Sequence, residues 1–600
     1  MSVEMPAGAI GPEICWEDGL VDGMEVTVLV VGASATGLFA AAELARHGVG
    51  AVVVDPALEP DTFSQAVGLQ AGTLEVLRHH GLDQELIARG RKLDRVDITH
   101  SGALLETVPL AGLPSPYPFM LVCPQAELEA LLLRQLQKLS IPVLRGISLV
   151  ALRQQPGVMH VEVELRAGVR PITIRARHVM ACDGALSVTR RLAGLTFPGD
   201  DLPRVSCLAD LGLEGVPPES PGTDEPVSMR VDFADGGVLS LTPLPQAGRF
   251  RLVMEMPGQA EAEPDEAEPS HEPMPLPSAA NLQTILRDRL HAPAIRLVGE
   301  PAGMCLPAYS RHAEAMRQGH IFLTGEAAHI HSPLGGLGLN IGILDVFNLC
   351  WKLALVEKGH AWPHLLDSYH HECHPVMPLA IRLMNELAAG IAIPGLPTGL
   401  RNTLAHFLGT FQAIRERVAM SMTRLGTGYR NSPAVDEQQE SWMEAVFSSG
   451  SGGVGLKAWR EFHHAFHAGD RIPAFPWPDG GILLDLLADG LHHALVFTGP
   501  DPSPEVLERA AQLARAIQLR GPGVGRVRVH LILGPGAGAI AAGLAEGLDQ
   551  VRDVDGLLAH DLGNPKDGVY ILRPDGYLGF RCQPAIFDPV QDWLATIFTM

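Results

Sequence analysis

A short apolar run followed directly by a glycine turn constrains the fold of this chain more than any other feature. Residues 26–31, Val-Thr-Val-Leu-Val-Val, are apolar and mostly β-branched, which is typical of a strand buried on both faces. A second such run, residues 51–54, ends at Asp55. The turn and the helix-like segment between the two runs begin with a set of small residues: Gly32, Ser34, Thr36 and Gly37. The pattern predicts a parallel βαβ unit.

The turn of this unit has the features of a dinucleotide site. Its glycines let the backbone approach a pyrophosphate, and the N-terminus of the following helix faces that anion. Asp55 lies 18 residues past Gly37, where an acidic side chain accepts hydrogen bonds from ribose hydroxyls. Ser34 stands at the middle glycine position of the G-x-G-x-x-G pattern. A βαβ unit that binds no ligand would look similar, so this motif alone does not assign a cofactor.

Two further motifs follow strand-like segments. Cys182-Asp183-Gly184 follows residues 178–181, and an acid in this place can hold a cofactor or simply make a turn. The third motif, Gly325-Glu326-Ala327-Ala328-His329, follows the apolar run 321–324. It continues toward a helix-like segment through Pro333, Gly336, Gly338, Leu339 and Asn340. A strand-end carboxylate can bind polyol hydroxyls, and the backbone N–H groups of a glycine-rich segment can face an electron-rich ring. The third motif is therefore the most specific.

Charge and cysteine content exclude several classes of function. The chain of 600 residues has 45 Lys and Arg against 68 Asp and Glu, a net charge of −23, whereas nucleic-acid proteins need basic residues to neutralise phosphates. Its 8 Cys show no C-x-x-C pattern, which favours a reduced, cytoplasmic compartment. No zinc spacing occurs among the 25 His, so no metal site is expected. Residues 26–42 carry no charge, but the turn inside them indicates a buried strand and helix and not a membrane span.

In this order along the chain, the three motifs resemble those of the single-component FAD-dependent aromatic hydroxylases, which share the para-hydroxybenzoate hydroxylase fold. The resemblance covers residues 25 to 400, and residues 456–600 resemble the thioredoxin-like domain of phenol 2-monooxygenase-like members, most clearly at Arg573-Pro574-Asp575-Gly576. Cys582 is the single cysteine of that C-terminal segment. Dithiol redox chemistry is therefore not expected in this segment, and we expect it to serve in packing or dimerisation.

The resemblance implies an α/β fold in which a Rossmann-like FAD-binding domain carries an inserted mixed β-sheet substrate domain. Residues 203–256 alternate as strands do, residues 259–278 are rich in Pro and acids as in an exposed loop, and the Gly- and Ser-rich run 449–453 is typical of a linker. The expected division is a loose extension at 1–24, FAD-binding parts at 25–200 and 306–400, mainly substrate-domain sheet at 201–305, a helical region and linker at 401–455, and the thioredoxin-like domain at 456–600.

The resemblance also implies the chemistry. FAD is the expected cofactor, NAD(P)H the co-substrate, and O2 supplies the oxygen that hydroxylates a small phenolic or polyketide-like aromatic. Gln125, ahead of a Glu-bearing helix, corresponds to a family residue on the flavin side, and Tyr369 and Glu372 match the family's Tyr-plus-Glu-Arg helix. The expected cofactor-binding set is Gly32, Ser34, Thr36, Gly37, Asp55, Gln125, Asp183, Gly325, Glu326, Pro333, Gly336, Gly338, Leu339 and Asn340. Because the cofactor carries the chemistry, no catalytic residue or general base is assigned. A homodimer is predicted.

Several positions depart from the family pattern. Gln65 and Gly72 stand where arginines are usual, Leu186 replaces another arginine, and Glu326 replaces Asp. Charge-assisted contacts to a phosphate are worth about 1.5–3 kcal/mol each, so we expect FAD to bind more loosely than is usual in the family. Two alternatives therefore stay open: a non-catalytic, chaperone-like partner that keeps the fold, and a flavin oxidoreductase that inserts no oxygen.

Overall fold

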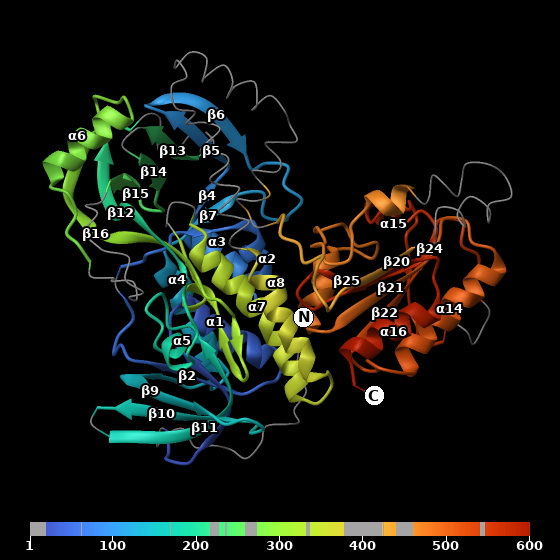
Figure 1. Cartoon of the computed structure of the whole chain (residues 1–600). Helices are drawn as coiled ribbons and strands as arrows, with labels where there is room; N and C mark the ends of the chain where they lie inside the picture. Colours follow the sequence, from blue (N-terminus) through green and yellow to red (C-terminus); the bar gives the residue numbers. More distant parts are fainter. Residues whose placement is uncertain are drawn as a thin grey trace.

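The computed structural model describes residues 20–61, 63–168, 170–216, 227–234, 237–257, 273–331, 336–376, 420, 423, 425–439, 460–540 and 546–599. Within these residues the chain is an α/β protein built on two large sheets, a C-terminal sheet and a small three-stranded sheet. Figure 1 shows the C-terminal sheet beside the other two large sheets, with the long helix α7 (Gly338–Glu357) between them. Pro333 and the expected linker 449–453 lie outside the described residues.

The first large sheet contains the predicted βαβ unit. Its strands are β17 (Arg317–Gln318), β18 (Ile321–Leu323), β11 (Arg170–Ala181), β1 (Glu25–Val31), β2 (Ala51–Asp55) and β8 (Val143–Arg145), with β9 (Ile147–Gln154) and β10 (Val161–Ala167) attached to β11. The strand β1 pairs in parallel with β2 and β11, and β11 pairs in parallel with β18. The helices α1 (Ala35–Arg46) and α4 (Gln125–Lys138) pack with α7 beside this sheet. The expected α/β unit at the N-terminal end is confirmed.

The uncharged stretch 26–42 forms β1 and the first part of α1, as expected from its turn. One described helix, α7, is long and apolar enough to cross a membrane, but 83% of its apolar window is buried inside the protein. Residues just before β1 are tied to β11, because the Thr173 amide donates to Asp22 Oδ1 at 2.8 Å. The described end of the expected loose extension is therefore held in place.

The second large sheet is mostly antiparallel and is drawn from distant parts of the chain. In spatial order its strands are β19 (His329–Ile330), β16 (Arg296–His312), β12 (Gly199–Glu214), β15 (Arg249–Pro257), β14 (Gly237–Pro243), β13 (Ser228–Ala234), β5 (Arg95–His100) and β6 (Ala103–Pro109). The sheet thus takes in β5 and β6 from the segment expected to belong to the FAD-binding part. Its outer face packs on α6 (Ala279–Arg289) through Leu282 and Leu286 (Figure 1).

Two cysteines of this sheet form a disulfide, which the cysteine pattern did not predict. Cys207 of β12 and Cys305 of β16 are directly opposite in the antiparallel register and are bonded to each other. Register across a sheet, and not spacing along the chain, brings them together, so a search for C-x-x-C motifs could not find the pair. The expectation that all cysteines are reduced is wrong for these two.

Smaller elements connect the two sheets. The strands β3 (Gly68–Leu69), β7 (Met120–Val122) and β4 (Arg91–Leu93) form the three-stranded sheet. The short helices are α2 (Ala71–Arg78), α3 (Asp83–Arg89), α5 (Val188–Leu192) and α8 (Asp367–Cys373).

The C-terminal sheet has the strand order β20 (Asp436–Gln439), β25 (Leu578–Gln583), β24 (Asp567–Leu572), β21 (His492–Thr498), β22 (Val527–Leu533) and β23 (Asp549–Arg552). Its helices are α14 (Pro504–Leu519), α15 (Leu557–Asp561) and α16 (Phe587–Ile597). The strand β20 comes from the segment 401–455, expected to be a helical region and linker, and it pairs in parallel with β25. Edge pairing by a short polar strand leaves no hydrophobic pattern in the sequence, which explains why it was missed.

A buried cluster of charges joins the C-terminal sheet to α7 and α8. The Arg573 guanidinium donates to both Glu372 oxygens at 2.7 and 2.8 Å and also pairs with Asp575. Lys352 Nζ donates to Glu372 Oε2 at 2.7 Å, and Trp351 Nε1 donates to Asp575 Oδ2 at 3.0 Å. Burial alone would raise the pKa of Glu372, but Arg573 and Lys352 hold it well below its usual value. The two acids and two cations balance one another out of contact with water.

Arg573→Ala should therefore be strongly destabilising. Removing one partner of a buried ion pair leaves the other charges uncompensated and costs about 3–5 kcal/mol. The free energy of unfolding of the FAD-free protein, measured by denaturant titration, should fall by that amount. Arg430→Ala is the matched control, because Arg430 pairs with Asp470 but its side chain is 60% exposed, and its loss should cost less than about 1 kcal/mol. Equal effects of the two substitutions would contradict a dominant role for the buried cluster.

A second buried group at this junction makes stability depend on pH. His492 of β21 lies among aromatic rings, 5.2 Å from Trp351 and 5.1 Å from Phe598 between centroids, and burial lowers its pKa to about 3. The unfolded chain takes up a proton at an ordinary histidine pKa of about 6.5, so the stability that neutral His492 contributes is full above that pH and is lost as pH falls toward 3.

His492→Phe should remove this part of the acid sensitivity while keeping a ring in the same space. Between neutral pH and about pH 5, the loss in free energy of unfolding should be about 2 kcal/mol smaller in His492→Phe than in the unchanged protein. Thermal melting of both proteins from neutral pH to pH 5 measures it. His560→Phe is the control, since the His560 side chain is 84% exposed, and it should leave the pH profile as it is. Parallel melting curves for His492→Phe and the unchanged protein would refute this assignment.

Candidate cofactor-binding site

The three sequence motifs meet at one edge of the first sheet. They follow β1, β11 and β18, three neighbouring parallel strands whose carboxyl ends lie together. Gly32 abuts the second motif, because a Cβ on Gly32 would lie 2.3 Å from the Cys182 carbonyl oxygen. Thr36 reaches the third motif, where its side chain lies 3.4 Å from a Cβ placed on Gly325. The edge of an open parallel sheet is where such folds bind ligands.

Packing alone requires two of the predicted glycines. Gly32 has a φ of +106°, and a Cβ on Gly37 would lie 1.9 Å from the Gly32 carbonyl oxygen. The helix α1 can therefore approach β1 closely only with glycine at both positions. Ser34, between them, has an extended backbone (φ −81°) and an exposed side chain at the N-cap of α1. Serine at this position is therefore free of backbone strain, although it departs from the glycine pattern.

Asp55 stabilises the turn that precedes α1. Its carboxylate accepts hydrogen bonds from the Ala33 amide at 2.6 Å and the Ala57 amide at 2.8 Å, one on each oxygen. Arg145 Nη1 lies 3.8 Å from the same group. A carboxylate has about four acceptor positions, so two contacts leave Asp55 able to accept ribose hydroxyls as well.

Asp183 mainly caps a helix. It accepts hydrogen bonds from the Ser187 hydroxyl at 2.5 Å, the Thr189 amide at 2.9 Å and the Thr189 hydroxyl at 2.8 Å, which fixes the start of α5. From α5, Arg190 donates to the carbonyl oxygens of Ala185 and Ala327, both at 3.0 Å. Arg190 thereby attaches the second motif to the third. The sequence left two roles open for Asp183, cofactor binding and turn formation, and its hydrogen bonds in this structure are those of turn formation.

The third motif surrounds an aspartate that the sequence analysis did not select. Asp345 Oδ2, on α7, accepts from the Gly325 amide at 3.1 Å and lies 2.7 Å from His329 Nε2. Glu326, by contrast, is exposed, and within the described residues its carboxylate has no hydrogen-bond partner. Its Oε1 lies 3.2 Å from a Cβ placed on Gly338, the first residue of α7. Glu326 is thus a strand-end carboxylate that remains open to hydroxyl donors.

The side chain of Asn340 forms hydrogen bonds to other parts of the protein. Its Oδ1 accepts from the Gln70 amide and the Thr73 hydroxyl, and its Nδ2 donates to the carbonyl oxygens of Gly68 and Gly336. This side chain therefore fixes the start of α7 against α2. Leu339 is half-buried against the hydrophobic core.

Gln125, at the start of α4, is linked to the glycine turn through Glu129, a residue that the sequence analysis also missed. Gln125 Nε2 and the Ala35 amide both donate to Glu129 Oε1, at 2.7 and 2.9 Å. Glu129 follows Gln125 by four residues, which places both on one face of α4, so this spacing was a usable signal. Gly72 is buried in α2, and its amide donates to the Thr423 carbonyl oxygen at 3.0 Å. An arginine at position 72 would therefore have to displace neighbouring protein.

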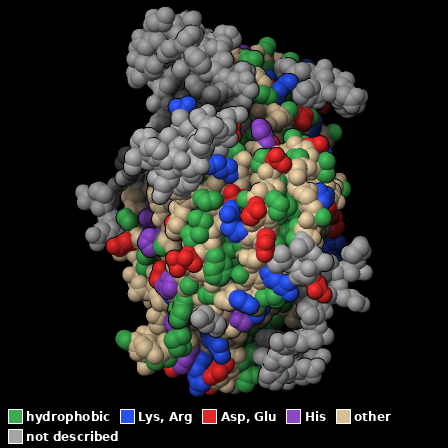
Figure 2. All heavy atoms as spheres, turned by 90° about the vertical axis from the view of Figure 1, so that its right-hand side faces the viewer, with side chains coloured by type: hydrophobic (Ala, Val, Ile, Leu, Met, Phe, Trp, Pro, Cys, Tyr) green, Lys and Arg blue, Asp and Glu red, His purple; other side chains and the backbone are tan. Residues whose placement is uncertain are grey.

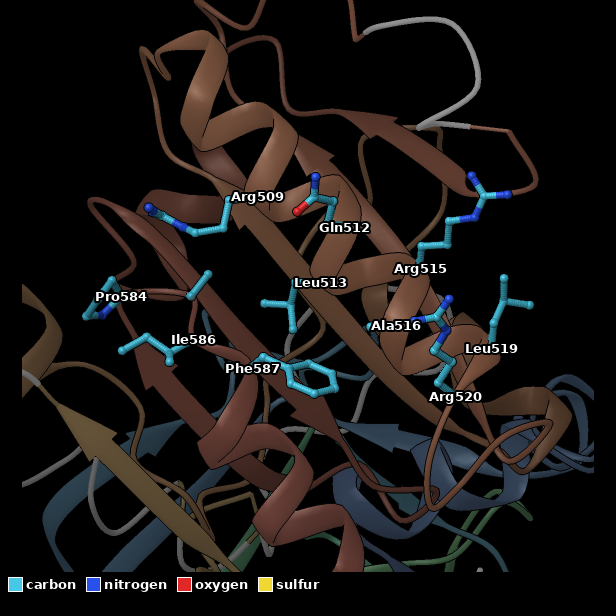
Figure 3. Close-up of a pocket in the computed structure, with 11 residues that line it drawn as sticks. Arg509, Gln512, Leu513, Arg515, Ala516, Leu519, Arg520, Pro584, Ile586 and Phe587 are labelled. Atoms are coloured by element: carbon cyan, nitrogen blue, oxygen red, sulfur yellow. The ribbon is translucent and has the colours of Figure 1, made fainter.

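The described cavities lie on the C-terminal sheet, away from these motifs. One, of about 780 Å³, lies between α14 and residues 584–587 and is lined among others by Leu513, Ile586 and Phe587 (Figure 3). Arg509 at its margin is already paired with Asp567 at 2.6 Å. Figure 2 faces this side of the molecule and shows apolar, basic and acidic side chains interspersed over its described part. The described residues contain no cluster of His, Cys, Asp and Glu suited to a metal ion.

The residues at the sheet edge fit the nucleotide half of FAD. Glycine at 32 and 37 lets the turn and α1 pack closely, Asp55 keeps free acceptor positions, and Glu326 offers a carboxylate without a partner among the described residues. A family model described as "FAD binding domain" matches residues 25–383, which include all three motifs.

Relatives with assigned names are similar over most of the chain. Pentachlorophenol 4-monooxygenase of Sphingobium chlorophenolicum is 30% identical over 93% of this chain and 94% of its own length. The 6-methylpretetramide 4-monooxygenase of Streptomyces rimosus is 28% identical over 93% and 90%. Among solved structures, the anhydrotetracycline hydroxylase of Streptomyces rimosus is 25% identical, with a TM-score of 0.65 over 96% of this chain and 99% of that one. The flavin-dependent monooxygenase PieE, solved with FAD and substrate, is 22% identical with a TM-score of 0.68 over 96% and 100%, which shows a shared fold.

Glu326→Ala should weaken FAD binding without weakening the fold. The exposed carboxylate has no partner in the described protein, so its removal leaves nothing unsatisfied, whereas the loss of hydrogen bonds from a charged group to the cofactor should raise the Kd for FAD about tenfold or more. Flavin titration and thermal melting of the FAD-free protein measure the two effects separately. Glu300→Ala, at another exposed acid, is the control. Unchanged FAD affinity in Glu326→Ala would remove Glu326 from the site.

Proposed function

The chain belongs to the FAD binding domain family, and we propose that it hydroxylates a phenolic ring of a multi-ring, polyketide-like substrate, with NAD(P)H and O2 as co-substrates. It is an FAD-dependent aromatic monooxygenase. FAD supplies the redox and oxygen-transfer chemistry when bound. The protein's own residues bind and orient the cofactor and substrate and exclude water.

The inner face of the second sheet supports an aromatic substrate with polar substituents. Side chains alternate along β12, so Cys207 and Ala209 pack toward α6 while Ser206, Leu208 and Asp210 face the other way. Ser206 is 1% exposed, and within the described residues its hydroxyl has no hydrogen-bond partner. Buried hydroxyls are rarely left unpaired, so Ser206 is a candidate partner for a polar group of the substrate.

Arg251 connects this face to the FAD-binding part. It lies on β15, is 1% exposed and donates to Asp210 Oδ1 at 2.6 Å. Its Nη1 also donates to the Gln65 carbonyl oxygen at 3.0 Å, in the loop between β2 and β3. The inner face therefore looks toward the elements that follow the βαβ unit. This arrangement is the observation that carries the proposed substrate position.

Relatives of two kinds bear on the substrate. Two are named for a tetracyclic substrate, 6-methylpretetramide or anhydrotetracycline. Another is named for pentachlorophenol, which has a single ring. We favour the larger class because the second sheet extends over eight strands and two of them, β5 and β6, come from outside the expected insertion.

We also propose the finer features that the sequence suggested. The order β21–α14–β22 followed by β24, β25 and α16 supports a thioredoxin-like domain at 456–600, extended by β20. The proposed domain boundaries are otherwise those of the sequence analysis, and the predicted residue set is proposed to surround FAD, with Asp183 and Asn340 positioning neighbouring segments. A homodimer in the cytoplasm remains the proposed state of the protein.

One relative favours a second candidate function. Dialkyldecalin synthase of Streptomyces rugosporus is 28% identical over 79% of this chain and 98% of its own length, and its name describes a synthase and not an oxygenase. A chain of this fold could therefore convert a substrate without inserting oxygen, which differs from the non-catalytic partner considered from the sequence.

The experiment that tests the proposed function measures NAD(P)H oxidation and oxygenated product together. The purified protein, supplied with FAD, should show a flavin band and consume NADH or NADPH faster in the presence of anhydrotetracycline than of phenol. Mass spectrometry should show a gain of one oxygen atom that comes from labelled O2. A product of unchanged composition would favour the second candidate, and a protein that shows no flavin band even with FAD in excess would contradict the hydroxylase.

Ser206→Val should impair substrate binding specifically. Valine has nearly the shape of serine plus one methyl group and cannot donate a hydrogen bond, so kcat/KM should fall about tenfold, mostly through KM. FAD affinity should stay the same. Ser64→Val is a control in the loop between β2 and β3, because the Ser64 hydroxyl already accepts from the Ala126 amide of α4. Equal kcat/KM in Ser206→Val and the unchanged enzyme would place the substrate elsewhere.

A further inference from the structure

A buried carboxylate of the protein occupies the N-terminus of α1. Glu129 of α4 is 8% exposed, and its Oε1 accepts from the Ala35 amide at 2.9 Å and from Gln125 Nε2 at 2.7 Å. Ala35 is the first residue of α1, so its N–H is one of those that a helix offers to an anion. In this fold the anion at that place is the pyrophosphate of a dinucleotide. The protein therefore fills, with its own acid, part of the subsite that the cofactor's phosphates need.

The charged groups around the turn are mostly acidic. Asp55 holds the Ala33 amide at 2.6 Å, and Asp61 is close enough to Glu129 to disfavour its charged form. Arg145 is the cation on this side: its Nη1 lies 3.8 Å from Asp55, its Nη2 donates to the Ala33 carbonyl oxygen, and its charge favours the carboxylate of Glu129. A pyrophosphate at the start of α1 adds negative charge beside three acids and one arginine.

We propose that Glu129 is protonated when FAD is bound, so that it is a proton-dependent positioning residue of the pyrophosphate subsite. As a carboxylate, Glu129 takes the Ala35 N–H and repels the phosphates. As a neutral acid, it still accepts from Gln125 and can donate its own O–H to a phosphate oxygen. The proton comes from solvent, and the O–H bond of Glu129 is the single bond that forms. The inference rests on FAD binding and is independent of the substrate proposed above.

The surroundings of Glu129 support this assignment. Burial raises the pKa of Glu129, and the hydrogen bonds from Gln125 and Ala35 only partly oppose the rise. A neighbouring phosphate raises it further, because like charges disfavour ionisation. FAD affinity is therefore highest at low pH. It falls by up to about tenfold per pH unit as pH rises through the pKa of Glu129 in the free protein, and levels off above the pKa in the complex.

Titration of the full-length, FAD-free protein with FAD, followed by flavin fluorescence between about pH 5.5 and pH 8.5, tests the proposal. Glu129→Gln keeps the size of the side chain and its acceptor oxygen but has no charge. It should bind FAD about tenfold more tightly than the unchanged protein at the upper end of this range and should lose the pH dependence. Glu127→Gln is the matched control, on the same helix but paired with Arg89 at 2.6 Å, and should keep the original pH dependence.

A second measurement needs no variant. Calorimetry of FAD binding in two buffers that differ in ionisation enthalpy reports the protons taken up. The unchanged protein should take up a proton at a pH between the pKa of Glu129 in the free protein and its pKa in the complex. Glu129→Gln should take up none. The proposal is overturned if the unchanged protein takes up no proton, or if Glu129→Gln binds FAD no more tightly and with the same pH profile. A failure of this kind would leave the hydroxylase function untouched, since that function is tested by product formation.

Discussion

The parallel pairing of β11 with β1 on one side and with β18 on the other is the constraint on which the rest of the structure depends. It brings together three loops that lie about 150 residues apart along the chain, because parallel strands end at the same edge. The loops then fix one another: Gly32 touches the Cys182 carbonyl, and Arg190 holds the Ala327 carbonyl. Most of the motif side chains therefore hold protein in place, and few of them are free to face a ligand.

The helix α7 connects these loops to the C-terminal sheet. It begins at Gly338 beside Glu326, holds Gly325 through Asp345 near the cofactor motifs, and reaches the C-terminal sheet through Trp351 and Lys352. Charges buried at that far contact are balanced by partners from both bodies, so neither body has a complete set alone. The charged cluster and the glycine-rich motif are thus the two ends of one rigid element.

The sequence predicted the parts of the fold that depend on local pattern. The apolar run at 26–31 and its turn became β1 and the start of α1, and the small residues at 32 and 37 proved to be required by close packing. Contacts between distant segments were not predictable in this way. The disulfide between Cys207 and Cys305 depends on sheet register, and the addition of β5, β6 and β20 to their sheets depends on edge pairing that leaves no periodic signal. Within the site, Glu129 and Asp345 were missed because they act on backbone amides of other elements.

The shared burial of Glu372, Lys352, Arg573 and Asp575 has a consequence for how such chains can be recombined. A C-terminal domain taken from a relative would need an arginine and an acid at the same turn, and a body taken from a relative would need the matching acid and lysine on α8 and α7. The ion pairs at these four positions therefore need residues from both modules. Exchange of one module for a version that lacks these charges would leave a charge buried without its counterpart, so the two modules should be exchanged together.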